Sequence, residues 1–151
     1  AEHQELVKFV KDFGFDMMGV FPYSQEPGTP MGRMEGQLPE EVKQARVEEL
    51  MLAQQEVAFR RARSLKGQTL DVLIDRPAGR NEEDGWVARA KSQAPDIDSV
   101  TIVHGGSAGD GSGTALHAGQ IVQVKVTGAD GYDLVAELPR KKGRPLTVLR
   151  A

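Results

Sequence analysis

Residues 120–127, QIVQVKVT, alternate between polar and apolar side chains. Side chains of a β-strand point alternately to opposite faces, so Val122, Val124 and Val126 share one face. Polar side chains occupy most of the other face. The stretch therefore predicts a strand with one face in a core and the other toward solvent.

Four further strands are predicted around this one, each bounded by turn-forming residues. Their ranges are 69–75 (TLDVLID), 85–90 (GWVARA), 100–104 (VTIVH) and 132–138 (YDLVAEL). A turn from Gly128 to Gly131 is predicted to join 120–127 to 132–138. Five short strands separated by glycine-rich turns are typical of a small closed or partly open barrel. The sequence thus predicts an all-β barrel over residues 67–139.

The segment before the barrel predicts two helices and one isolated strand. Apolar side chains recur at helical spacing over residues 2–13, and Gly14 is a plausible stop. A longer helix is predicted from Pro39 to Lys66, with acidic residues in its first turn and basic residues in its last turns. Between the helices, Met17–Tyr23 (MMGVFPY) predicts a short buried strand, followed by a loop over 24–38. The predicted fold class is therefore α+β. Since the isolated strand has no partner here, we expect the chain to be a piece of a larger protein.

The composition excludes several kinds of chemistry from this chain. It contains no cysteine, so it can form no disulfide, supply no thiolate nucleophile and hold no cluster through cysteine ligands. No run of 18 apolar residues indicates a membrane span, and no apolar segment behind a basic start indicates a secretory signal. We therefore expect a cytoplasmic protein.

Charge is distributed unevenly along the chain. Residues 67–139 contain eleven acidic and five basic side chains. Residues 140–151 contain five basic side chains and no acidic one. The sequence therefore predicts an acidic barrel followed by a basic tail.

No motif in the sequence indicates a catalytic or metal site. The glycine-rich stretch Gly105–Gly113 lacks the lysine and the following helix of a phosphate-binding loop, so we interpret it as a hairpin loop. His3, His104 and His117 show no metal-ligand spacing. Asp96 and Asp98 can in principle bind a cation or transfer protons, but turn formation is the favoured interpretation because no nucleophile or histidine is near.

Two blocks of the sequence resemble the methylthiotransferase family of radical S-adenosylmethionine enzymes. Residues 13–30 (FGFDMMGVFPYSQEPGTP) and 37–55 (QLPEEVKQARVEELMLAQQ) resemble the end of the catalytic barrel and its exit helix. Residues 67–75, 88–103 and 118–137 resemble the TRAM domain, an OB-like barrel, that follows. The segments APDIDSV and VTGADGYDLVAE are similar to the RimO-like branch, which modifies an aspartate of ribosomal protein S twelve.

The resemblance implies that the chain consists of three segments and that the cofactors are bound by another part of the enzyme. Residues 1–66 would end the catalytic barrel, residues 67–139 would form the TRAM barrel, and residues 140–151 would form the basic tail. The whole enzyme would use two 4Fe–4S clusters and S-adenosylmethionine. Their cysteine motif is absent here, so no catalytic, cofactor-binding or metal-binding residue carries over and this chain is not expected to act as an enzyme by itself.

Three roles for the chain remain open at this point. The first is recognition of a basic ribosomal protein as substrate, which the acidic barrel favours. The second is RNA binding, as in the MiaB-like branch that modifies tRNA, and the third is a purely structural cap. Candidate partner-binding residues are Arg89, Lys91, Asp96, Asp98, Lys125, Asp130 and Asp133.

Overall fold

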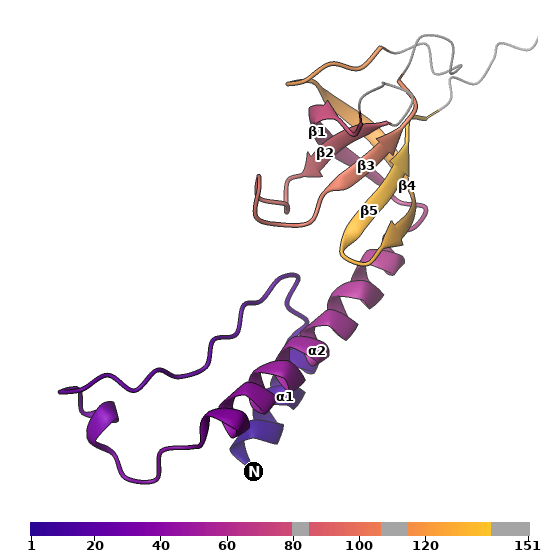
Figure 1. Ribbon diagram of the computed structural model, residues 1–151. Helices are drawn as coiled ribbons and strands as arrows, with labels where there is room; N and C mark the ends of the chain where they lie inside the picture. The colour runs from indigo at the N-terminus through magenta and orange to yellow at the C-terminus, as the bar shows by residue number, and fades with distance from the viewer. Residues whose placement is uncertain (80–84, 107–114, 140–151) are drawn as a thin grey trace, which may run out of the picture. The chain divides into compact units, whose positions relative to one another are not determined.

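In the computed structural model the chain folds into two long helices, one short 3-10 helix and five strands (Figure 1). The structure describes residues 1–79, 85–106 and 115–139. They fall into two compact units, Ala1–Arg61 and a second that begins at Ala62. The predicted basic tail and most of the Gly105–Gly113 loop lie outside the described residues.

The first unit is built on a pair of helices, and both were predicted. Helix α1 spans Glu2–Phe13, and it ends at Gly14, whose left-handed backbone lets its N–H donate to the Val10 oxygen at 3.2 Å. Helix α2 spans Glu40–Ser64. An apolar cluster joins the two helices, and its buried members are Val7, Val10, Leu50 and Ala53. Charged pairs at the rim of this contact include Lys11 with Glu56 at 3.0 Å.

The strand predicted over Met17–Tyr23 is wrong. These residues form no regular element, and Phe21 is 87% exposed. Met18 and Val20 pack on the helix pair as partly buried side chains. A strand requires a neighbouring strand for its N–H and C=O groups, and no strand of the first unit is available among the described residues. The following loop contains the 3-10 helix η1, Met31–Arg33.

Hydrogen exchange should differ between residues 120–127 of the barrel and residues 17–23 of the first unit. Amides of residues 120–127 are expected to exchange slowly, since residues 121–125 pair with β1 and the residues that follow pair with β5. Amides of residues 17–23 are expected to exchange fast, because they have no ladder partner. Mass spectrometry of the deuterated chain measures both. Equal protection of the two stretches would show that residues 17–23 have a partner in solution.

All five predicted strands are confirmed, and they close into a barrel. The strands are β1 (Thr69–Pro77), β2 (Trp86–Ala90), β3 (Thr101–His104), β4 (Ile121–Asp130) and β5 (Asp133–Glu137). Their order around the barrel is β1-β2-β3-β5-β4. Neighbours run antiparallel except β3 and β5, which run parallel. The barrel and the two helices together confirm the α+β fold class.

Apolar side chains fill the barrel as the alternation in β4 predicts. Val124 is fully buried among Val72, Ile74 and Val103 from the neighbouring strands. Val126, on the same face of β4, joins a second cluster with Leu134 and Ala62. Since Ala62 lies in the last turn of α2, this end of the helix belongs to the unit that contains the barrel.

The predicted turn from Gly128 to Gly131 begins too early. Strand β4 continues through Gly128 to Asp130, and the register shifts between Val126 and Gly128. Glycine is common at such a bulge, where one strand contains an extra residue. The tight turn is therefore shorter and centres on Gly131, whose φ is 60°.

Of the helices that the structure describes, none combines the length and the apolar character of a membrane span.

Candidate partner-binding surface of the barrel

Strand directions bring two loops together at one end of the barrel. β2 and β4 finish at this end, while the parallel strands β3 and β5 begin there. The β2–β3 loop, residues 91–100, and the β4–β5 turn therefore meet at the same end. We call it the loop end of the barrel. It contains five of the seven candidate residues: Lys91, Asp96, Asp98, Asp130 and Asp133.

Gln93 organises the β2–β3 loop from inside. Its side-chain oxygen accepts hydrogen bonds from the Ala90 N–H at 2.8 Å and from the Thr101 hydroxyl at 2.9 Å. Its side-chain nitrogen donates to the Ser99 hydroxyl at 3.2 Å. Thr101 is fully buried. One amide side chain thus joins the end of β2, the loop and the start of β3.

Two of the candidate carboxylates bind backbone of their own barrel. Asp98 accepts a hydrogen bond from the Ala94 N–H at 2.8 Å, across the tip of the loop. Asp133 accepts one from the Val100 N–H at 2.8 Å, which fastens the loop to the start of β5. Both side chains therefore support the loop, which is the turn-forming role that the sequence favours for Asp98.

The other three candidate residues of the loop end are exposed. Asp96, Asp130 and Lys91 lie at the surface, and their charged side-chain groups form no bond in the part of the chain that the structure describes. Asp96 has a φ of 61°, the one positive value at a described residue other than glycine. Aspartate tolerates this conformation better than most residues. Of the candidate residues, two carboxylates and one ammonium group of the loop end therefore face solvent.

Arg89 and Lys125 do not join this group. Arg89 lies on the outer wall of the barrel, where its Nε donates to the Asp75 carboxylate at 3.1 Å and both side chains are about one-third exposed. Lys125 is exposed on the outer face of β4, beside Thr69 of β1 in the strand register. The structure therefore divides the predicted residues between the loop end and the wall.

Sequence reasoning missed Gln93 and Ile97. Gln93 is half-buried, and a single polar residue in a loop carries no pattern that predicts a buried bond network. Ile97 lies between two aspartates in the stretch APDID, and its side chain is 84% exposed. An apolar residue in the middle of a turn-forming stretch is the signal that could have identified it.

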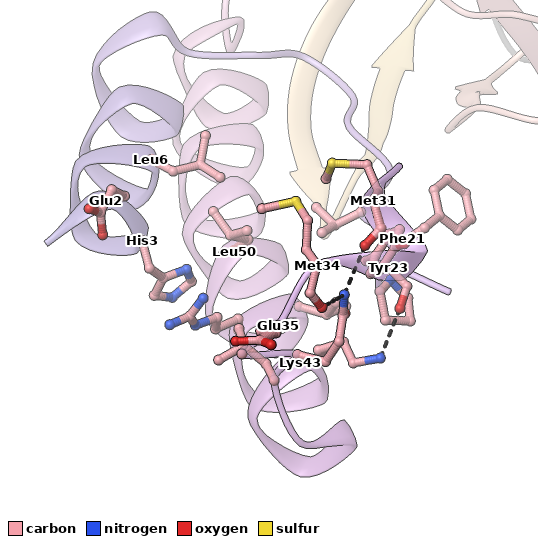
Figure 2. A pocket seen from close by; sticks show the side chains of 17 residues that line it. Glu2, His3, Leu6, Phe21, Tyr23, Met31, Met34, Glu35, Lys43 and Leu50 are labelled. Atoms are coloured by element: carbon pink, nitrogen blue, oxygen red, sulfur yellow. Dashed lines mark hydrogen bonds between the residues drawn. The ribbon is translucent and has the colours of Figure 1, made fainter. Parts of the chain in front are cut away.

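The first unit contains an open groove of about 600 Å³ that no sequence pattern predicts (Figure 2). Leu6, Leu50, Phe21, Met31 and Met34 supply much of its apolar lining. Glu2, Glu35, Lys43 and Arg46 add charge to its lining.

Hydrogen bonds fix the loop that forms one side of the groove. The Gln37 amide donates to the Met31 and Met34 oxygens, and Lys43 donates to the Tyr23 oxygen. His3, also in the lining, bonds to Glu49 at 2.7 Å. Hydrogen bonds from Gln4 and His3 hold the pKa of Glu49 below its usual value.

Comparison with known proteins adds two findings. The model of the TRAM domain matches residues 67–138. The ribosomal protein uS12 methylthiotransferase RimO of Desulfitobacterium hafniense is 41% identical over 137 residues, which are 91% of this chain and 28% of that protein. RimO of Symbiobacterium thermophilum is 43% identical over 146 residues, with 95% of this chain and 27% of that protein covered. The chain thus spans less than a third of the length of these relatives.

Proposed function

Because this chain is a RimO-like C-terminal part with a TRAM domain at residues 67–138, we propose that it recognises the substrate of a methylthiotransferase. The substrate is a basic protein, ribosomal protein uS12, which is the protein named for the relatives. The chain does not catalyse the reaction itself. It holds the substrate while the rest of the enzyme carries out the chemistry.

The exposed carboxylates at the loop end carry this proposal. The carboxylates of Asp96 and Asp130 face solvent without a bonded partner among the described residues, so their charge is available to a partner. Residues 67–139 contain eleven acidic and five basic side chains, so the barrel attracts a cationic protein from a distance. The same charge repels the phosphates of a nucleic acid.

The cofactors of the reaction belong to the rest of the enzyme in this proposal. The family resemblance implies two iron–sulfur clusters and S-adenosylmethionine. Cluster iron is held by cysteine thiolates in most proteins. This chain has no cysteine, so its residues do not fit such a cluster and no chemical step is assigned to them.

RNA binding is the second candidate function. The observation that favours it is the exposure of Lys91 and Lys125, whose ammonium groups have no bonded partner among the described residues. They lie apart, however, one at the loop end and one on the outer wall. Two separated lysines on an acidic barrel provide a weaker phosphate track than RNA-binding surfaces usually offer. Recognition of a basic protein is therefore the better-supported function.

Neutralising the two exposed carboxylates should weaken binding to the basic protein. The variant combines Asp96→Asn with Asp130→Asn, and uS12 is titrated into the full chain at two salt concentrations. We expect an affinity loss of about tenfold at the lower salt and a smaller loss at the higher salt, since salt screens exposed charges. The readout is the dissociation constant, measured by calorimetry.

A matched control separates local charge from total charge. The combination of Glu26→Gln with Glu48→Gln removes two exposed carboxylates from the first unit and should leave the affinity nearly unchanged. A stem–loop RNA is titrated in parallel. Tight RNA binding that weakens on Lys125→Ala, together with unaltered uS12 binding by the Asp96/Asp130 variant, would support the RNA alternative instead.

A further inference from the structure

An apolar side chain stands at the tip of the β2–β3 loop. Ile97 is 84% exposed, more than any other isoleucine or leucine among the described residues. It follows Asp96, whose carboxylate is exposed and has no bonded partner within the described ranges. Single exposed apolar residues are common on proteins. Ile97 differs from them by its position between the groups that shape the loop.

The loop that presents Ile97 is held in shape at both of its ends. Gln93 connects its first half to Ala90 and Thr101 through bonds of 2.8 and 2.9 Å. Asp133 holds Val100 at its end, and the Asp98 carboxylate bonds to the Ala94 N–H on the other side of Ile97. A loop that already has its bound shape loses little conformational entropy when a partner binds. The tip is therefore suited to present a contact residue.

We propose that Ile97 and Asp96 form a two-part anchor for the partner protein. Ile97 enters an apolar pocket on the partner, and the Asp96 carboxylate pairs with a lysine or arginine at the rim of that pocket. This inference rests on the proposed function and deepens it, since it specifies what the partner must offer. Centrally placed apolar anchors next to charged groups dominate the affinity of many protein interfaces.

The chemistry of the tip fits a protein better than a nucleic acid. An isoleucine has no aromatic ring on which a base can stack. A carboxylate beside it would repel the nearest phosphate. A cationic protein with a shallow apolar pocket satisfies both side chains at once.

Ile97→Ala in the full chain tests the anchor. We expect its dissociation constant for uS12 to rise about tenfold or more, as for a central contact residue. The matched control is Ile121→Ala, because Ile121 is 72% exposed but lies at the start of β4, away from the loop end. This control should leave the affinity unchanged, and both variants should unfold at the temperature of the parent chain.

A second pair of variants tests whether the shape of the loop matters. Gln93→Glu keeps an oxygen that accepts the bonds from Ala90 and Thr101, whereas Gln93→Leu removes it. We expect the leucine variant to weaken uS12 binding and the glutamate variant to retain most of it. Equal affinities of the two variants would contradict a preformed anchor.

The outcomes distinguish this inference from the proposed function. If the Asp96/Asp130 variant weakens uS12 binding and Ile97→Ala does not, the anchor is wrong and the proposed function stands. If neither affects binding of uS12, both are wrong. A loss that is equal for Ile97→Ala and Ile121→Ala would also overturn the anchor, because it would reflect general hydrophobic adhesion.

Discussion

Replacing Ile74 by alanine is expected to lower the free energy of unfolding of the barrel by about 2–5 kcal/mol. Ile74 lies in β1, has no exposed surface and packs in the core cluster with Val72, Ala88 and Val103. Its backbone N–H donates to the Gln120 oxygen and its backbone oxygen accepts from the Gly119 N–H, each at 2.8 Å, so both groups are bonded to the segment that precedes β4. The strand therefore cannot easily move inward to fill the cavity that the substitution leaves.

Urea unfolding followed by circular dichroism measures this loss. Ile121→Ala is the matched control, since it removes the same atoms from a side chain that is 72% exposed. Its effect should stay within about 0.5 kcal/mol, as for most surface substitutions. A similar small effect at both positions would mean that the interior of the barrel is loosely packed in solution.

Gly85→Ala is expected to destabilise the barrel by on the order of 3 kcal/mol, from two causes that add. Gly85 precedes β2 with a φ of +95°, a conformation that is strained for residues with a Cβ atom and costs about 1–3 kcal/mol. A Cβ atom at this position would also lie 2.8 Å from the backbone oxygen of Val103 in β3. That oxygen belongs to a strand of the barrel, so it cannot move away from the added Cβ atom without disturbing the pairing of β2 with β3.

The chain contains a glycine that separates the two causes. Gly67 has a similar φ of +87°, but a Cβ atom there would have no neighbour within 4 Å. Gly67→Ala should therefore show the cost of the backbone conformation alone, about 1–2 kcal/mol. Urea unfolding of both variants measures how much more the free energy of unfolding falls in Gly85→Ala than in Gly67→Ala. If Gly67→Ala costs as much as Gly85→Ala, the contact with Val103 contributes nothing.

The barrel was predictable from the sequence because its signals are local. Polar and apolar side chains alternate over residues 122–127 of β4, and the burial of Val124 and Val126 follows from that alternation alone. The stretch Met17–Tyr23 shows the limit of such reasoning. A run of apolar residues indicates that a segment can be buried, but it contains no information about whether a second strand is present to pair with it.

The candidate surface was predictable only in part, for a related reason. Its aspartates could be named because acidic residues in turns are visible in the sequence. Their separate roles could not, since Asp98 and Asp133 bind backbone N–H groups whose positions depend on the folded loop. Asp133 and Val100 are far apart in the sequence and meet only because β3 and β5 run parallel.

Closure of the barrel also limits how any partner can attach. Each of the five strands is paired with a neighbour on both sides. Many proteins capture an extended peptide by letting it join a sheet as an additional strand, which requires a free edge with unpaired N–H and C=O groups. In the closed barrel no described strand lacks a neighbouring strand on either side. We therefore expect recognition by this barrel to depend mainly on side chains and loop tips, where single substitutions change specificity without disturbing the sheet.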